Sequence, residues 1–305
     1  MHAILLPLDG SALAESARPL ATSLAARTGA ILILAAVYDP RGAVLGVLGG
    51  MGERRWDMEA KATLRGALAA AQARVAQQAP TLATEVAVLD GVPADALAAY
   101  AATTGVDLIV LTTHGLGGVS RLWLGSVTDA LVRQTRIPVL VVHASARGAK
   151  TPNGADAIHR VLVPLDANVE SEAVLQTAIT VAGTVGVRYT LLRVAAPLHP
   201  ALESYAFDAE IERDIIAQQA RAQRALDEIA VRLRERGVDV TTAVRLDNQP
   251  ARAILAFATE SEADLIAIAT HGLGRLSRFL LGSVADKVLR GATMPVLVQH
   301  LAAGN

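Results

Sequence analysis

Residues 107–142, DLIVLTTHGLGGVSRLWLGSVTDALVRQTRIPVLVV, decide the fold of this chain, because residues 264–298, DLIAIATHGLGRLSRFLLGSVADKVLRGATMPVLV, repeat them closely. In each copy a short apolar run leads into Thr-His-Gly, a glycine-bearing loop, Gly-Ser, a helical pattern and Pro-Val-Leu-Val. An apolar run without polar alternation is typical of a strand covered on both faces, as in a parallel sheet, and the helix supplies the crossover. The stretch therefore predicts a strand, a loop, a helix and a second strand.

The loop after the first strand of each copy offers backbone chemistry suited to an anion. Two glycines stand nine residues apart and a serine follows the second one: Gly115, Gly125 and Ser126 in the first copy, and Gly272, Gly282 and Ser283 in the second. Glycine lets the main chain approach a ligand closely, and the start of a helix favours negative charge. The serine can cap the helix and donate its hydroxyl to a phosphate. Alternatively, these residues are only turn glycines and helix caps.

The Gly-x9-Gly-Ser spacing after a strand, closed by Pro-Val-Leu-Val, resembles the universal stress protein family, and the chain is similar to a tandem member with two such domains. The nucleotide-binding members carry Gly-x2-Gly-x9-Gly-Ser/Thr. Here Thr112 and Ala269 replace the first glycine of that pattern. The resemblance implies ATP as ligand, one per domain, and Mg²⁺ or Mn²⁺ can accompany its phosphates as their ligand.

The resemblance also implies which residues line each nucleotide site. In the first copy they are Pro7, Leu8, Asp9, Val37, Thr112, His114, Gly115, Gly118, Arg121, Gly125, Ser126 and Val127. In the second copy they are Pro164, Leu165, Asp166, Val194, Ala269, His271, Gly272, Arg275, Arg278, Gly282, Ser283 and Val284. Proline, leucine and valine would form the adenine pocket, although apolar residues there are also ordinary core.

Several of these residues have an ordinary structural alternative. Asp9 and Asp166 either accept from ribose hydroxyls or the base, or cap a strand-to-helix turn. The arginines of the loop either grip phosphate or face solvent. The histidines have no second ligand or nucleophile at a suitable spacing, so we expect them to order the loop and predict no metal site and no catalytic residue.

Landmarks of the first half recur in the second half at a constant offset of 157 residues, as in the pairs Pro7 and Pro164, Pro93 and Pro250, and Pro138 and Pro295. The chain is therefore a duplication, and one fold prediction serves both halves. We predict domains at 1–144 and 158–305, joined by a linker at 145–157 that is rich in small, polar and turn residues. Each is an α/β domain with a Rossmann-like, doubly wound, parallel five-stranded sheet, and the resemblance implies strand order 3-2-1-4-5.

The remaining elements of the first half follow from apolar periodicity and turn residues. We predict strands at His2–Pro7, Ala30–Val37 and Thr84–Leu89, and helices from Ser11 or Ser16 to about Arg27, at Asp57–Gln78 and at Ala94–Thr103. Asp39–Trp56 contains five glycines, which disfavour a helix. It is a lid, a partner surface or a simple surface loop.

Composition narrows the function classes. A net charge of −1 argues against nucleic acid and anionic membranes as main partners, and the absence of cysteine excludes disulfides and thiol catalysis. No apolar run is long enough to span a bilayer, and the first residues, MHAILLPLDGS, predict a strand and not a signal peptide. We expect a soluble, cytoplasmic protein.

The resemblance implies that the two halves pack as an internal pseudo-dimer through their last strands, Val139–His143 and Val296–His300, which would otherwise be exposed edges. A further homodimer is compatible with this arrangement. The function that the sequence favours is a stress-response regulator that binds ATP without rapid turnover, and not an enzyme. The alternatives are an interaction module that does not bind nucleotide and a slow ATPase on the same fold.

Overall fold

The computed structural model describes residues 1–42, 53–113, 124–143, 158–166, 173–197, 209–270 and 281–300. The elements of the first half are β1 (Ala3–Pro7), α1 (Ala12–Glu15), α2 (Arg18–Thr28), β2 (Ile31–Tyr38), the 3₁₀ turn η1 (Pro40–Gly42), α4 (Glu53–Gln78), β3 (Thr84–Asp90), α5 (Pro93–Thr103), β4 (Leu108–Thr112), α6 (Ser126–Gln134) and β5 (Val139–Val142). Those of the second half are β6 (Arg160–Pro164), α7 (Ala173–Ala182), β7 (Arg188–Ala195), α8 (Ala209–Glu235), β8 (Asp239–Leu246), α9 (Pro250–Glu260), β9 (Leu265–Thr270), α10 (Ser283–Gly291) and β10 (Val296–His300). The predicted linker at 145–157 lies outside the described residues.

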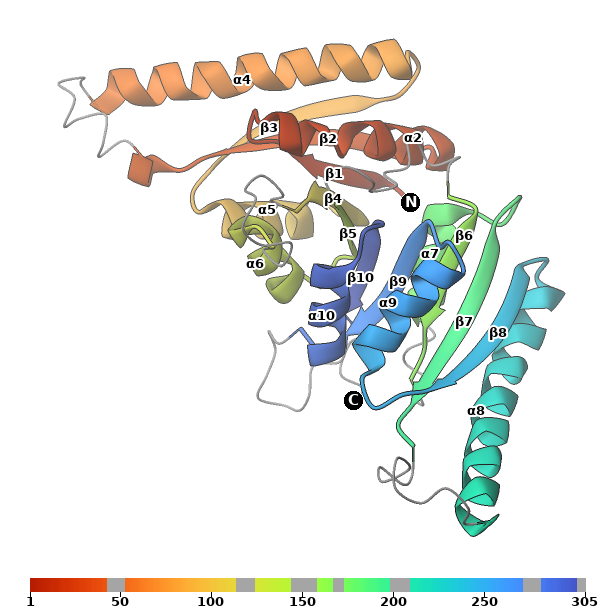
Figure 1. Cartoon of the computed structure of the whole chain (residues 1–305). Coiled ribbons are helices and arrows are strands. Elements are labelled where there is room, and N and C mark those ends of the chain that lie inside the picture. The colour runs from red at the N-terminus through yellow and green to blue at the C-terminus, as the bar shows by residue number, and fades with distance from the viewer. Residues whose placement is uncertain are drawn as a thin grey trace.

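The strands form one mostly parallel sheet that runs through both halves (Figure 1). Its order is β3-β2-β1-β4-β5-β10-β9-β6-β7-β8, so each half has the predicted order 3-2-1-4-5. Both predicted five-stranded sheets are present. The sheets join edge to edge into a single ten-stranded sheet, because pairing of the two last strands satisfies backbone groups that would otherwise stay open.

The seam between the halves is the antiparallel pair β5 and β10, which confirms the predicted contact of the last strands. Leu140 stands opposite Leu297, Val141 opposite Val296, and Val139 opposite Val298. Leu140 and Leu297 are both fully buried. A short strand of four apolar residues gains a covered edge in this way, and the two halves gain a common core.

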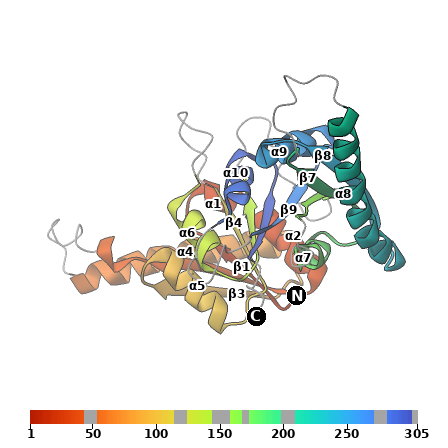
Figure 2. The same cartoon turned by 90° about the horizontal axis from the view of Figure 1, so that it is seen from below.

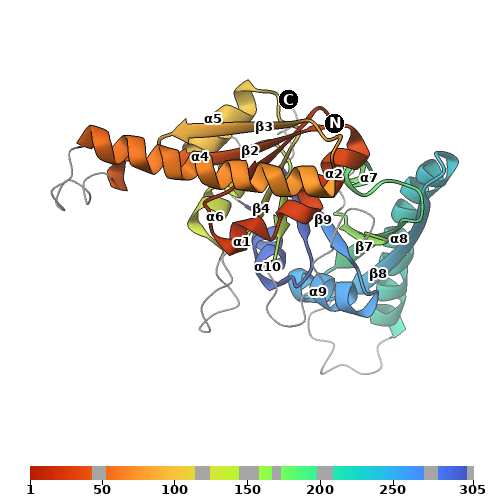
Figure 3. The ribbon, with the colours of Figure 1, turned by 90° about the horizontal axis from the view of Figure 1, so that it is seen from above.

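Helices cover both faces of the sheet, and each face has one core that continues across the seam. On one face α2, α4, α7 and α8 contribute to the first core, and on the other α5, α6, α9 and α10 contribute to the second (Figures 1 and 2). The uninterrupted apolar runs of β1, β4 and β9 follow from this double cover, since successive side chains of a strand point to opposite faces. Helix α4 runs along β2 and β3, as Figure 3 shows.

The first helix of the chain is interrupted, whereas one continuous helix was predicted. Ser11 caps α1 by accepting from the backbone N–H of Ala14 at 3.1 Å, and α2 starts anew at Arg18. Pro19 explains the interruption, because proline has no N–H to donate to a carbonyl one turn earlier. Gly29, at φ 69°, is the C-cap of α2, which ends one residue after the predicted end at about Arg27.

The long helix α4 begins four residues before the predicted start at Asp57. Residues 53–56, Glu-Arg-Arg-Trp, follow the last glycine of the glycine-rich segment and have adequate helix propensity, so the helix extends to them. Residues 43–52 lie outside the described residues. The predicted lid or partner surface at Asp39–Trp56 therefore stays a prediction.

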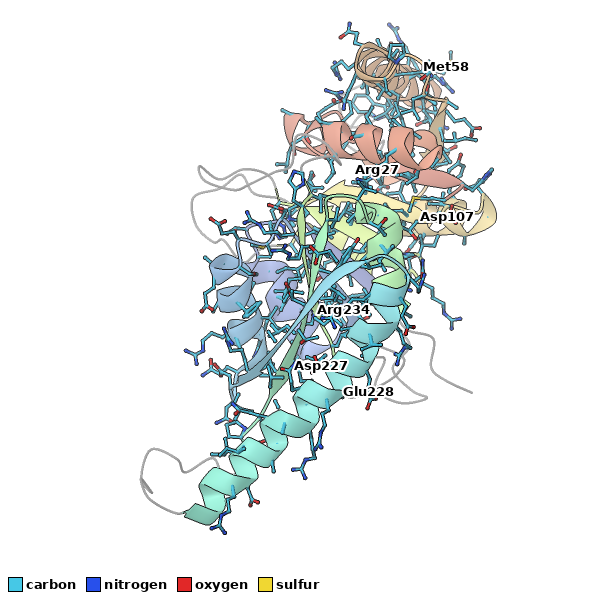
Figure 4. The ribbon with its side chains drawn as sticks, turned by 90° about the vertical axis from the view of Figure 1, so that its right-hand side faces the viewer. Arg27, Met58, Asp107, Asp227, Glu228 and Arg234 are labelled. Atoms are coloured by element: carbon cyan, nitrogen blue, oxygen red, sulfur yellow. The ribbon has the colours of Figure 1, made fainter. Side chains whose placement is uncertain are left out.

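Aspartates at the start of the two quoted stretches tie β4 to β1 and β9 to β6. One carboxylate oxygen of Asp107 accepts from the backbone N–H groups of His2 and Ala3, and Asp107 is labelled in Figure 4. Asp264 accepts in the same way from His159 at 3.0 Å and Arg160 at 2.9 Å. These bonds fix the amino ends of the central strands, so the carboxyl ends are also held side by side.

Side chains on α2 and α8 form further hydrogen bonds to neighbouring elements. Arg27 of α2 donates to the carbonyl of Val181 in α7 and so links the two halves on the face opposite α6 and α10 (Figure 4). On α8, Asp227 accepts from the hydroxyl of Thr242 at 2.8 Å, and Arg234 donates to the carbonyl of Val240 at 2.9 Å. Both bonds hold α8 to the edge strand β8.

Candidate functional site

The candidate site of each half lies where the chain changes direction across the sheet. In the first half β1 lies between β2 and β4. The helices after β1 contribute to one core and α6 after β4 contributes to the other. Connections that leave neighbouring parallel strands toward opposite faces open a crevice at the carboxyl ends, which is the usual ligand site of such sheets. The second half repeats this arrangement at β6 and β9.

The helices after these crevices start at glycines of equal conformation. Gly125 is the N-cap of α6 at φ −57° and ψ 147°, and Gly282 is the N-cap of α10 at φ −57° and ψ 145°. The prediction that Ser126 and Ser283 cap these helices was wrong, since each is the first helical residue and no side chain caps either helix. Both serines are exposed. The first N–H groups of a helix have no partner within it, so they are available to an anion.

Neither backbone conformation nor crowding by described residues requires glycine at position 282. A φ of −57° suits any residue, and a Cβ built on Gly282 would meet no described atom within 4 Å. The absent side chain leaves the start of α10 open. A ligand that approaches the main chain closely at this point would explain why the residue is glycine.

The aspartate after β1 holds the turn between strand and helix, which is one of its two predicted roles. Asp9 is exposed and accepts from the N–H of Ser11 at 2.9 Å, while Gly10 between them has φ 82°. This local bond shapes the turn before α1. Among the described residues, none donates a hydrogen bond to the second carboxylate oxygen of Asp9. Asp166 is likewise exposed, after β6.

The apolar residues expected in the pocket divide into two groups. Leu8 and Leu165 are buried, at 6% and 4% exposure, and belong to the core on the face of α2 and α7. The others are partly exposed at or near strand ends: Pro7, Val37, Pro164 and Val194. The second group is therefore the part of the predicted pocket that a ligand could reach.

The two residues that replace a glycine of the family pattern are accommodated differently. Thr112 ends β4, and its carbonyl accepts from the hydroxyl of Thr128 in α6 at 2.9 Å. Ala269 packs against the core, and Ala285 stands where Thr128 stands in the first half. The start of α6 is thus fastened to the strand before it by a side chain. The start of α10 lacks that bond.

The glycine loops themselves lie outside the described residues, which stop at Thr113 and Thr270 and resume at Leu124 and Leu281. The predicted positions that fall there are His114, Gly115, Gly118, Arg121, His271, Gly272, Arg275 and Arg278. The described residues nearest the start of each helix also include Val127 and Val284, both partly buried against the core.

Two general features of the described residues bear on function. They contain no group of three or more histidine and acidic side chains placed to hold a metal ion. They also contain no helix with the length and apolar character needed to cross a bilayer.

Sequence reasoning missed the side chains that join α6 to α10. Asp129 and Arg133 of α6 form ion pairs with Asp286 and Arg290 of α10, and His143 and His300 reach the opposite half. The signal was present, because an aspartate and an arginine four residues apart occur at the same position of both repeats.

Comparison with known proteins places the chain in a family. The sequence model of the universal stress protein family matches residues 1–143 and 157–300. A universal stress protein of Mycobacterium tuberculosis (strain ATCC 25618 / H37Rv) is 32% identical over 197 residues, which cover 63% of this chain and 61% of that protein. The alignment thus spans less than two thirds of that relative.

Solved structures agree in fold. The crystal structure of a universal stress protein from Archaeoglobus fulgidus DSM 4304 covers 98% of both chains with a TM-score of 0.64 at 18% identity. A universal stress protein solved in complex with cAMP covers 47% of this chain and 98% of its own, at 27% identity and a TM-score of 0.37, too low a likeness to assign a ligand here. On the match of the family model to both halves, the chain belongs to the universal stress protein family.

Proposed function

We propose that this chain is a cytoplasmic stress-response regulator that binds ATP at two strand-end sites, one in each half, without rapid turnover. One observation carries the proposal. At the crevice of both halves a helix starts at a glycine with no side-chain cap and an exposed serine as its first residue. A free helix start at the carboxyl edge of a parallel sheet is suited to phosphate.

The phosphates would contact the first backbone N–H groups of α6 and α10, together with the hydroxyls of Ser126 and Ser283. Glycine at the N-cap would let the phosphate oxygens approach the main chain. The positive end of each helix dipole would stabilise their charge. A divalent cation would be held by the phosphates themselves, since metal ions of this kind commonly rely on substrate oxygens.

The nucleoside would lie on the other side of the crevice, toward β1 and β2 or β6 and β7. Pro7 and Val37 offer partly exposed apolar surface there, and Asp9 offers a carboxylate oxygen to the ribose hydroxyls. A carboxylate repels phosphate groups, so we place Asp9 beside the ribose and not beside the phosphates. Asp166 would take the equivalent part in the second half.

Binding without rapid turnover follows from the kinds of side chain in the site. Hydrolysis needs a positioned general base to activate water. The described carboxylates directly after β1 and β6, the strands that border the two crevices, are Asp9 and Asp166, and Asp9 already shapes its own turn. The proposed effect of ATP is therefore on conformation or association, through its different affinity for different states.

A second candidate, an interaction module that does not bind nucleotide, is favoured by Thr112 and Ala269. Each places a side chain where the family pattern has glycine. Ala269 nevertheless packs against the core, which reduces the weight of this objection in the second half.

The test is to purify the protein without added nucleotide, denature it, and quantify released small molecules by chromatography and mass spectrometry. We expect about one to two equivalents of ATP per chain, as tight sites at helix starts retain their anion. Absence of nucleotide, together with no thermal shift in millimolar ATP and Mg²⁺, would favour the interaction module.

A glycine substitution then locates the sites. Gly282→Val places a branched side chain over the start of α10 and should remove about one equivalent of nucleotide, because backbone approach is blocked. Gly66→Val is the matched control, since Gly66 is exposed in the middle of α4 and a Cβ there meets nothing within 4 Å. Equal nucleotide content in both variants would remove Gly282 from the proposed site.

A further inference from the structure

The two helices that start at the proposed sites are joined to each other across the seam. Helices α6 and α10 lie on the same face of the sheet, on either side of the β5 and β10 pair (Figures 1 and 2). Side chains of the two helices meet across this seam. These side chains form two sets, and both sets obey the approximate two-fold symmetry of the duplication.

The first set is a closed ring of ion pairs, here called the Arg–Asp ring: Asp129, Arg133, Asp286 and Arg290. Within the helices, Arg133 Nε donates to Asp129 at 2.8 Å and Arg290 Nε donates to Asp286 at 3.0 Å. Across the seam, Arg133 Nη2 donates to Asp286 at 3.0 Å and Arg290 Nη2 donates to Asp129 at 2.9 Å. Each arginine therefore bridges both carboxylates.

The Arg–Asp ring is partly shielded from water. Its four side chains are only 26% to 30% exposed. The hydrogen bond from Arg133 holds the pKa of Asp129 below its usual value, and the hydrogen bonds to the aspartates raise the pKa of both arginines. Partly buried ion pairs in a network are screened less than isolated surface pairs and hold their geometry better.

The second set consists of two histidines that reach across the seam. His143, directly after β5, donates from Nε2 to the carbonyl of Leu289 at 2.8 Å, and His300 of β10 donates from Nε2 to the carbonyl of Val132. Both carbonyls lie in the last turn of a helix, α10 and α6 respectively, where carbonyls lack partners within the helix. Each half thus caps the carboxyl end of the other half's helix.

A helix that is held in its first turn by the aspartate of the ring, and in its last turn by the arginine and the capping histidine, transmits displacement along its axis. If phosphate draws the start of α6 toward the crevice, the cross-seam bonds stay intact only when α10 moves with it. A chain with one site filled would strain the Arg–Asp ring, whereas a chain with both sites filled or both empty would not. Moreover, the hydrogen bond from Thr128 holds the start of α6, whereas Ala285 leaves the start of α10 without such a bond. The position of α10 therefore depends more on its contacts with α6.

We propose that the Arg–Asp ring and the two capping histidines couple the two ATP sites, so that binding in one half raises the affinity of the other. This inference rests on the proposed function and adds a regulation of the same sites. Coupling is reciprocal, so the factor is the same whichever site fills first, and about fivefold or more is typical of coupled sites.

The coupling factor can be measured without assuming equal sites. Native mass spectrometry of the full chain with ATP and Mg²⁺ resolves zero, one and two bound nucleotides and gives the overall constant for double occupancy. Gly125→Val and Gly282→Val each leave one site, and give the two single-site constants. The overall constant divided by the product of the single-site constants is the coupling factor, expected at about five or more in the unaltered chain.

The ring is then broken by the double substitution Asp129→Asn and Asp286→Asn, in which the coupling factor should fall to about one. Asp239→Asn is the matched control, because Asp239 pairs with Arg188 at 3.0 Å on the exposed far strands of the second half, and there the factor should not change. If the asparagine variant does not fold, Arg133→Lys with Arg290→Lys decides. It retains the charge, but lysine cannot bridge two carboxylates as arginine does.

The outcomes separate the two proposals. No ATP bound at either site defeats the proposed function and the coupling together. Two bound ATP molecules with a coupling factor of one in the unaltered chain defeat the coupling alone. The same holds if the factor is unchanged when the ring is broken. A factor well above one that disappears only in the ring variants supports the coupling.

Discussion

The seam and the strand-end sites of this protein descend from the same duplication but follow different rules. At the seam the strand pairing and the ion pairs recur 157 residues away: Leu140 and Leu297 pair with each other, and the Arg–Asp ring closes on itself. At the sites the halves differ, with Thr112 and Thr128 in one and Ala269 and Ala285 in the other. Contacts between two copies constrain both copies at once, whereas each site is free to change alone.

The largest expected effect tests the symmetry of the seam. Leu140→Ala and Leu297→Ala each remove a fully buried side chain opposite the other, and each should lower the free energy of unfolding by about 2–5 kcal/mol. The two losses should agree within about 1 kcal/mol, which is within the usual scatter for one substitution type. Chemical denaturation followed by circular dichroism measures both.

Val86→Ala serves as the control for these substitutions, since Val86 is 42% exposed on the edge strand β3 and its loss should be small. A seam in which Leu140 mattered far more than Leu297 would contradict the symmetric description. It would place the stability of the junction mainly in the first half.

A smaller effect sharpens the asymmetry of the sites. Thr128→Val preserves the shape of the buried side chain and removes only the hydrogen bond to the carbonyl of Thr112, at a cost of about 1 kcal/mol in unfolding free energy. It should also weaken ATP binding in the first half, because the start of α6 loses its tie to β4. Calorimetric titration of the Gly282→Val background measures this site by itself.

Thr128→Ser is the matched variant, because it retains the hydroxyl and should stay close to the parent in affinity. If Thr128→Val and Thr128→Ser bind ATP equally well, the bond from Thr128 does not prepare the site. The difference between the halves would then have no consequence for binding.

The sequence made the repeated part of this comparison predictable. Apolar runs identified the central strands, and the constant offset identified the duplication. These features depend on the pattern of residues along the chain, which can be read without knowing which atoms meet in space. Family resemblance, and not periodicity, gave the strand order and the contact of the last strands.

What the sequence did not reveal depends on which atoms meet in space. The spacing of Asp129 and Arg133 predicts a pair within a helix, but the second arm of the arginine finds Asp286 only because the seam brings α10 alongside. The role of Ser126 was misjudged for a similar reason, since Gly125 and Ser126 compete for the cap and only the backbone angles decide. Pro19 indicates the interruption between α1 and α2, but the apolar period continues through it and favours one continuous helix.

The smallest expected effect uses pH to probe the seam at a single group. Burial lowers the pKa of His143 below its ordinary value of 6.5, so the folded protein favours the neutral ring. The unfolded chain binds a proton at a pH where the folded chain does not. The contribution of His143 is therefore complete above about pH 6.5 and is lost as pH falls below that value.

We thus expect the free energy of unfolding to fall between pH 7.5 and pH 5.5, and part of that fall to vanish in His143→Gln. Glutamine can still donate a hydrogen bond to the carbonyl of Leu289 but does not titrate. Asp129 of the Arg–Asp ring contributes little to this window, because the hydrogen bond from Arg133 lowers its pKa and places its own loss at more acidic pH. Parallel pH profiles for the parent and His143→Gln would show that proton uptake at the seam lies elsewhere, and the neutral His143 would then be only a packing residue.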